Sequence, residues 1–169
     1  MSNGKRKIVL IVHNVRSAHN VGSILRSADG FGIDSVYLTG YTPYPASPND
    51  QRLPYQAQRA DYLIHKTALG AEKYVNWSHQ SDVITLLHQL RKDGFLIVAL
   101  ELTSSASDLA KFKPRKNMAI ILGSELAGVD KKLLSLADRH LKIPMAGQKE
   151  SLNVSAAAAI AMYHLRRIT

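Results

Sequence analysis

Residues 143–167 read IPMAGQKESLNVSAAAAIAMYHLRR, and this stretch does most to decide the fold. Pro144 lacks a backbone N–H donor and has a fixed φ, so the strand that runs into it ends there. A polar loop over 146–150 follows, and an alanine-rich pattern predicts a helix over 152–167. The chain therefore passes from a strand through a loop into a helix.

This junction has two open interpretations. Loop amides and the first turn of a helix offer N–H groups without intrahelical partners, which suits a small polar ligand. Alternatively, Ser151 is an ordinary N-cap in front of a helix that packs into the core. The residues that would form its buried face recur at i, i+3, i+4 and i+7: Ala156, Ala159, Ile160 and Tyr163. Two motifs elsewhere in the chain favour the ligand site.

Apolar runs predict strands that are buried on both faces. They cover 8–12, 95–100 and 118–122, with shorter candidates at 35–38 and 141–145. Helical patterns lie between them at about 20–30, 80–93, 130–137 and 152–167. Strands that alternate with helices predict an α/β fold, in which a mostly parallel sheet carries helices on both faces. With no break in composition, we expect one domain over residues 1–169.

The charge balance points to a polyanionic partner. Lys and Arg outnumber Asp and Glu by 22 to 13, which gives a net charge of +9. An excess of this size on one small domain favours nucleic acid, because basic side chains neutralise phosphates. General solubility is the alternative explanation.

The composition also bears on the compartment. The chain has no cysteine, which excludes disulfides, thiolate metal ligands and a thiol nucleophile, and fits a reducing compartment. The longest apolar run, 156–163, is far shorter than a membrane span, and the apolar run at 8–12 is too short for an export signal. We therefore expect a cytoplasmic protein that does not cross a membrane.

The stretch 40–59 contains four prolines and predicts an irregular loop. It also contains Tyr41, Tyr44 and Tyr55. We favour a surface excursion whose tyrosines pack locally. The alternative is a flexible lid or an RNA-contacting loop whose rings are available for base stacking.

The first polar motif is NVRSAHNVGSILRSADGFGI at residues 14–33. Its apolar residues recur with helical spacing and predict a buried face of Val21, Ile24, Leu25 and Ala28. Arg26 then projects from the opposite face, and Asn20 is the expected N-cap. Gly22, one turn before Arg26, would leave room for a phosphate or ribose beside the guanidinium. Arg16 and Arg26 are candidate phosphate contacts, with solvated surface arginines as the alternative.

The second motif is ILGSELAGVD at residues 121–130. A buried strand ends at Gly123, and ligands of open α/β sheets bind at the carboxyl ends of strands. Gly123 and Gly128 allow close backbone approach or a positive φ. Glu125 is either a polar anchor of the site or an acidic residue that starts a helix. The strand that ends at Leu100 and Glu101 is a candidate fourth edge of the same pocket.

Together these motifs resemble the SpoU (TrmH) family of RNA ribose 2′-O-methyltransferases, within the SPOUT superfamily. The resemblance depends on Asn20-x-Gly22-x-x-x-Arg26-x-Ala28, on Gly123-x-Glu125-x-x-Gly128, and on Ile143-Pro144-Met145 followed by Ser151-Leu152-Asn153-Val154. The three pieces occur in the family's order over almost the whole chain. Each piece is weak by itself, and the ordered set is specific.

The resemblance implies a C-terminal trefoil knot that holds S-adenosyl-L-methionine. The residues expected to line that cofactor's pocket are Leu100, Gly123, Ile143, Met145, Ser151 and Leu152. The implied catalytic neighbourhood consists of Asn20, Arg26, Glu125, Ser151 and Asn153. It also implies an obligate homodimer with the active site near the interface, for which the helix 152–167 is the candidate contact surface.

The implied reaction is attack of a ribose 2′-oxygen on the methyl group of S-adenosyl-L-methionine. In the family, the arginine that matches Arg26 is proposed to act as a base. Because a guanidinium stays protonated in proteins, we favour a fixed positive charge that stabilises the 2′-oxyanion and holds a phosphate. No metal is expected, since the histidines lack metal-ligand spacing.

Three other functions remain as alternatives. The chain has no G-x-G-x-x-G after a strand and no phosphate-binding G-x-x-x-x-G-K-[ST], which argues against a conventional nucleotide-binding enzyme. A non-catalytic RNA-binding module of the same fold suits the charge but not the joint presence of Arg26, Glu125 and Asn153. Without flanking RNA-binding segments we expect tRNA as the substrate, with rRNA as the alternative.

Overall fold

A computed structural model describes residues 6–113 and 116–167. Within these residues, seven strands form one sheet in the order β3-β2-β1-β6-β4-β7-β5, and all neighbouring strands run parallel. The strands are β1 (Ile8–His13), β2 (Ser35–Thr39), β3 (Trp77–Gln80), β4 (Leu96–Leu100), β5 (Ser107–Asp108), β6 (Met118–Leu122) and β7 (Arg139–Lys142). The predicted parallel α/β fold is therefore confirmed, while the trefoil knot stays a prediction.

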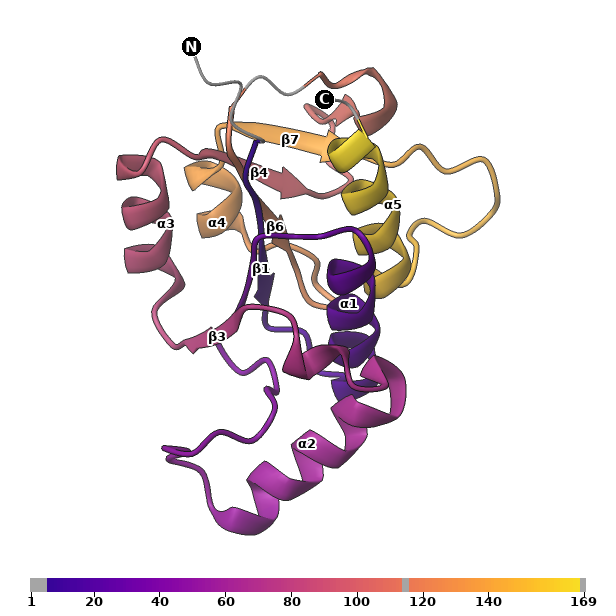
Figure 1. Cartoon of the computed structure of the whole chain (residues 1–169). Coiled ribbons are helices and arrows are strands. Elements are labelled where there is room, and N and C mark those ends of the chain that lie inside the picture. Colours follow the sequence, from indigo (N-terminus) through magenta and orange to yellow (C-terminus); the bar gives the residue numbers. More distant parts are fainter. Residues whose placement is uncertain (1–5, 114–115, 168–169) are drawn as a thin grey trace.

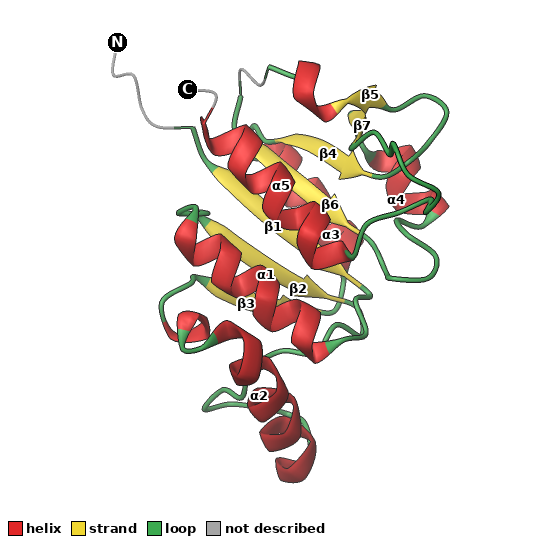
Figure 2. Cartoon of the chain, turned by 90° about the vertical axis from the view of Figure 1, so that its right-hand side faces the viewer, coloured by secondary structure: helices red, strands yellow, loops and turns green. Residues whose placement is uncertain are grey.

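Helices cover both faces of the sheet (Figure 1). They are α1 (Ala18–Gly30), α2 (Pro54–Ala68), α3 (Val83–Lys92), α4 (Lys131–Leu136) and α5 (Val154–Arg167). Short 3₁₀ turns lie at Ala71–Lys73 and Leu109–Lys111. α1 and α5 lie on one face, α3 and α4 on the other, and α2 packs on α1 and extends beyond it (Figure 2). Among the described residues, none of the helices combines the length and apolar character needed to span a bilayer.

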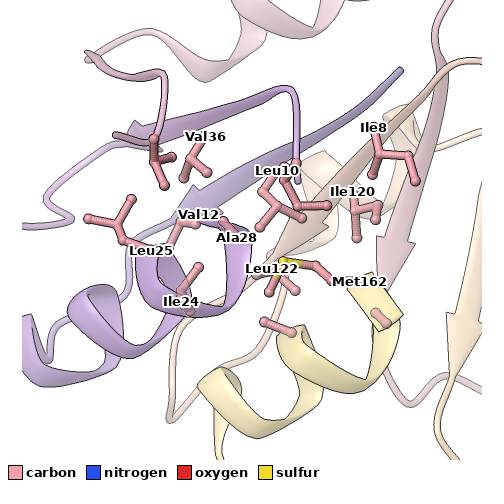
Figure 3. Close-up of a cluster of buried hydrophobic side chains, with 14 of the residues drawn as sticks. Ile8, Leu10, Val12, Ile24, Leu25, Ala28, Val36, Ile120, Leu122 and Met162 are labelled. Carbon is pink, nitrogen blue, oxygen red and sulfur yellow. The ribbon is translucent and has the colours of Figure 1, made fainter. Parts of the chain in front are cut away.

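The strand β1 shows why the central strands are apolar throughout. Leu10 and Val12 join a cluster that includes Ile24 of α1 and Met162 of α5 (Figure 3). Ile11 points the other way, into a second cluster built with residues of α3 and α4. Because successive side chains of a strand alternate and both faces are covered, every residue of β1 is buried.

The loop predicted over 40–59 is only partly correct, because α2 begins within it at Pro54. Proline suits the first turn of a helix, where its missing N–H would have no partner. The apolar pattern of this helix is weak, since only Ala57, Ile64 and Ala68 of its residues are buried. The edge strands β3 and β5 were missed for a similar reason, because they are short and carry mostly polar residues.

The buried face of the C-terminal helix differs from the predicted one. Its buried residues are Ala158, Ala161, Met162 and Leu165. In the predicted face, Ile160 and Tyr163 are instead 42% and 50% exposed. In a helix that is apolar on nearly all sides, periodicity allows several stripes, and packing against α1 and the sheet selects one.

Candidate active site

A cavity of about 550 Å³ lies at the carboxyl ends of β4, β6 and β7, beside the start of α5. Its wall includes every residue expected to line the cofactor pocket: Leu100, Gly123, Ile143, Met145, Ser151 and Leu152. Glu101, Glu125 and Asn153 also face it. The strand-loop-helix junction at 143–154 is therefore one wall of a cavity, as the ligand-site interpretation predicts.

The loop after β6 is tightly folded. Ser124 and Gly128 exchange two backbone hydrogen bonds of 3.0 Å, which brings Gly128 against Gly123. A Cβ on Gly123 would collide with the Gly128 backbone, and Gly128 has a φ of +66°. Both glycines are therefore required by the backbone, as the sequence predicted.

Glu101 fixes this loop to the end of β4. Its carboxylate accepts hydrogen bonds from the backbone N–H groups of Val129 (2.7 Å) and Leu102 (2.9 Å). The sequence placed Glu101 at the pocket edge but assigned it no role. An acidic residue directly after a buried strand was the only signal, and it did not reveal the partners 1 and 28 positions away.

Glu125 binds the start of α1 to the same loop. One carboxylate oxygen accepts from the Arg16 backbone N–H (3.0 Å), and the other accepts from the Ser17 N–H (3.0 Å) and from Asn20 Nδ2 (2.9 Å). Burial raises the pKa of Glu125, but these hydrogen bonds outweigh it and hold the pKa below its ordinary value. Glu125 is thus an ionised anchor, and the alternative of a helix-starting residue is wrong.

Asn20 also connects α1 to the start of α5. Its Oδ1 accepts a hydrogen bond of 3.1 Å from Asn153 Nδ2. The Oδ1 of Asn153 in turn accepts from the backbone N–H and the hydroxyl of Ser155, at 2.8 and 2.6 Å. Glu125, Asn20 and Asn153 therefore form one chain of hydrogen bonds that joins the three sequence motifs.

Both predicted N-caps need correction. The side chain of Ser17, not Asn20, accepts from the Asn20 backbone N–H at the start of α1. At α5 it is Asn153, not Ser151, whose side chain accepts from a first-turn N–H. Ser151 and Leu152 lie before the helix in the cavity wall. The side chain of Asn20 is consequently free to reach Glu125 and Asn153.

The arginines lie away from the cavity wall. The predicted buried face of α1 is confirmed, and Arg26 is exposed on the opposite face. Arg16 is exposed too, and only its backbone N–H contacts Glu125. Gly22 does not make room beside Arg26, because it is buried and a Cβ there would collide with the Ile64 carbonyl of α2.

Several known proteins are similar to this chain. The profile of the SpoU rRNA Methylase family matches residues 7–163. A tRNA (guanosine(18)-2′-O)-methyltransferase of Thermus thermophilus is 30% identical over 163 residues, which are 95% of this chain and 74% of that protein. A TrmH family protein of Staphylococcus epidermidis is 29% identical over 159 residues, or 94% of this chain. The chain spans only 58% of the length of this second relative.

A solved structure shows the same fold. The AdoMet-bound rRNA methyltransferase of Sinorhizobium meliloti superposes with a TM-score of 0.81 and is 23% identical. The match covers 99% of this chain and 58% of that one. The profile match, the order of the three motifs and their meeting at one cavity agree, and the chain belongs to the SpoU rRNA Methylase family.

Proposed function

We propose that this protein transfers a methyl group from S-adenosyl-L-methionine to a ribose 2′-oxygen of RNA. The observation that carries the proposal is the hydrogen-bonded chain Glu125–Asn20–Asn153 at the rim of the cavity. It brings together all three motifs on which the family resemblance depends. The relatives' names support the reaction, since one modifies the 2′-oxygen of a tRNA guanosine.

The cavity has the properties expected of a pocket for this cofactor. Its volume of about 550 Å³ falls within the usual range for small-molecule sites. Apolar side chains such as Leu100, Ile143 and Leu152 would hold the adenosine part, and the loops at Gly123 and Ser151 would offer backbone groups for hydrogen bonds. When bound, S-adenosyl-L-methionine would supply an electrophilic methyl group at this site.

The residues of the chain would mainly position the reactants. Glu125 accepts three N–H groups and has a lowered pKa, so it is suited to anchoring and not to taking a proton. Asn20 and Asn153 would present amide groups to the ribose at the rim. Arg26 would contribute a fixed positive charge that binds an adjacent phosphate and stabilises the developing 2′-oxyanion.

A second copy of the chain is part of the proposal. Arg26 does not line the cavity of its own chain within the described residues. α5 leaves a face of small and apolar residues open to solvent, which includes Ala156, Ile160 and Tyr163. We propose that two copies pair across this face as a homodimer, in which Arg26 of one copy serves the cavity of the other.

The proposed substrate is tRNA in the cytoplasm, with rRNA as the second candidate. The net charge of +9 supports a polyanionic partner, and the lack of cysteine supports a reducing compartment. The tRNA assignment rests on the Thermus thermophilus relative, which is named for tRNA. The Sinorhizobium meliloti protein of the same fold is named as an rRNA methyltransferase, which keeps rRNA as the second candidate.

One experiment tests the reaction and the substrate together. Purified protein would be given tritiated S-adenosyl-L-methionine with either tRNA or rRNA from cells that lack its gene. We expect label in tRNA, followed by nuclease mapping to a 2′-O-methylated nucleotide. Label in neither RNA, from a protein that binds the cofactor in calorimetry, would exclude RNA methylation by this chain alone.

A further inference from the structure

α2 carries a stripe of aromatic and basic side chains on its outer face. We call it the α2 stripe and define it as Tyr55, Arg59, Tyr62 and Lys66. Tyr55 and Tyr62 are 65% and 60% exposed, and both basic residues are exposed as well. The spacing of four, three and four residues places all of them on one side of the helix.

The opposite side of α2 is the one that packs. Ala57, Ile64 and Ala68 are its buried residues, and Ile64 and Ala68 lie against α1. Figures 1 and 2 show that α2 extends beyond the rest of the molecule, so its outer face is open along the helix. In the single chain the rings of Tyr55 and Tyr62 therefore face solvent and are accessible to a partner.

Tyr44 provides a contrast within the same region. Its ring is stacked on His79 with centroids 4.1 Å apart, and the Arg52 guanidinium lies 3.5 Å from its centroid. Arg52 also bonds to the Tyr44 carbonyl and to Asp50. Tyr44 is thus packed locally, as the surface-excursion interpretation predicts. Tyr41 and Tyr55 of the same stretch are 61% and 65% exposed, so that interpretation holds for one of its three tyrosines.

Charge favours a polyanion on the stripe over a second copy of the chain. Arg59 and Lys66 are both cationic, and Lys66 Nζ lies 4.6 Å from the centroid of the Tyr62 ring. Asp61, the one acidic residue in the α2 sequence, accepts a hydrogen bond from the Ala46 N–H on another side of the helix. Two stripes brought face to face by a two-fold axis would set cations against cations.

The stripe is also connected to the candidate active site. Thr67, one residue after Lys66, donates a hydrogen bond of 2.8 Å to the carbonyl of His19 in α1. One turn further along α1, the absence of a side chain at Gly22 allows the backbone of Ile64 in α2 to approach closely. The next residue after His19 is Asn20, which bonds to Glu125 and Asn153. The C-terminal end of α2 therefore packs beside the first turn of α1, from which the site is built.

We propose that the α2 stripe binds unpaired nucleotides of the RNA that the cavity methylates. This inference rests on the proposed function for the identity of the RNA. Tyr55 and Tyr62 stack on two exposed bases, while Arg59 and Lys66 bind the phosphates between them. Unpaired nucleotides are specified because a tyrosine ring needs an open base face, which a duplex does not offer. Such stacking changes affinity by about tenfold for each ring.

The test measures RNA affinity without the cofactor, so that it does not depend on catalysis. Fluorescence anisotropy would follow binding of a labelled oligouridine about 12 nucleotides long and of a duplex of equal length. We expect the wild-type protein to prefer the single strand. The double variant Tyr55→Ala/Tyr62→Ala should bind it about 100-fold more weakly, because each ring contributes about tenfold, with little change for the duplex.

Two controls isolate the role of the rings. Tyr74→Ala removes a tyrosine that is 81% exposed but lies outside the stripe, and it should leave the affinity unchanged. Tyr55→Phe/Tyr62→Phe keeps both rings and should retain the preference for single strands. Lys66→Gln should reduce the dependence of RNA affinity on salt concentration by the amount expected for about one phosphate contact. Lys92→Gln on α3 should leave that dependence unchanged.

Several outcomes would overturn the inference. An unchanged affinity in the double alanine variant, or an equal loss in Tyr74→Ala, would do so. If the double alanine variant changed its sedimentation coefficient but kept its RNA affinity, the stripe would be a protein interface instead. Failure of the proposed function would look different: the wild type would bind RNA through the stripe yet transfer no tritiated methyl group to bulk RNA.

Discussion

Asn153 donates a hydrogen bond of 3.1 Å from its Nδ2 to Oδ1 of Asn20, although 133 positions separate the two residues in the chain. Because Asn20 also donates to Glu125, this contact links the starts of α1 and α5 and the loop after β6. A site assembled in this way has its reacting groups fixed by elements far apart in sequence. Its chemistry should therefore be sensitive to each of the three segments.

Arg26→Ala should abolish methyl transfer while leaving cofactor binding intact. The guanidinium is exposed and outside the cavity wall, so its loss removes charge stabilisation of the 2′-oxygen and leaves the pocket unchanged. We expect a fall in turnover of about 100-fold or more, measured with tritiated donor, and an unchanged cofactor Kd by calorimetry. Lys92→Ala on α3 is a control, and equal losses of binding and turnover in Arg26→Ala would contradict the assignment.

Mixing two inactive variants should restore activity if Arg26 acts on the neighbouring copy's cavity. Arg26→Ala and Asn153→Ala would each be inactive as homodimers. A mixed dimer would then contain one complete site, formed by the intact cavity of one copy and the intact Arg26 of the other. Unfolding and refolding an equal mixture should give about a quarter of the wild-type activity, because about half of the dimers are mixed. No recovery would show that Arg26 serves its own chain.

Glu125→Gln should lower stability at neutral pH and remove part of the pH dependence. A glutamine offers one acceptor oxygen where the carboxylate receives three N–H groups, which costs about 1 kcal/mol for this partly exposed site. The folded pKa of Glu125 lies below its ordinary value of 4.5. Its contribution is therefore full above pH 4.5 and is lost as the pH falls through the folded pKa.

Thermal unfolding of both proteins at neutral pH and at about pH 3.5 provides the measurement. The difference in Tm between the wild type and Glu125→Gln should narrow in acid. Asp93→Asn is a suitable control, because Asp93 directly follows α3 and its side chain accepts a hydrogen bond from Gln89, four positions earlier. A constant difference in Tm at both pH values would show that Glu125 is not the ionised anchor.

Gly22→Ala should destabilise the packing of α2 on α1. A Cβ at Gly22 would collide with the Ile64 carbonyl and the Thr67 hydroxyl, so the two helices must separate, at a cost of about 1–3 kcal/mol. Gly30→Ala is a matched control in the same helix, since nothing lies within 4 Å of the new Cβ. It should be neutral or stabilise by up to about 1 kcal/mol. Urea unfolding would give both values, and equal effects would contradict the packing role.

The sequence predicted much of the sheet and of the site. The apolar runs at 8–12, 95–100 and 118–122 correspond closely to β1, β4 and β6, because a strand covered on both faces must be apolar throughout. All six residues expected at the cofactor pocket line one cavity. Polar motifs at strand ends predict such a site, because the carboxyl ends of parallel strands meet at one edge.

The helices were harder to predict from local sequence pattern than the buried strands. The sequence missed α2, whose three buried residues are too widely spaced to show a helical period, and it chose the wrong face of α5, where apolar residues occur on several sides. It also assigned Gly22 to a ligand, although the residue that needs its missing Cβ is Ile64, 42 positions later in the chain.

By itself, the sequence determined which segments are buried strands, which motifs carry polar chemistry and to which family their order belongs. Hydrophobic periodicity and motif spacing are local properties, and they can be read along the chain. Only the tertiary structure decided that Glu125, Asn20 and Asn153 share one hydrogen-bonded chain and that Arg26 lies outside the cavity of its own chain. Those relationships depend on how distant elements pack in three dimensions, and no local pattern encodes them.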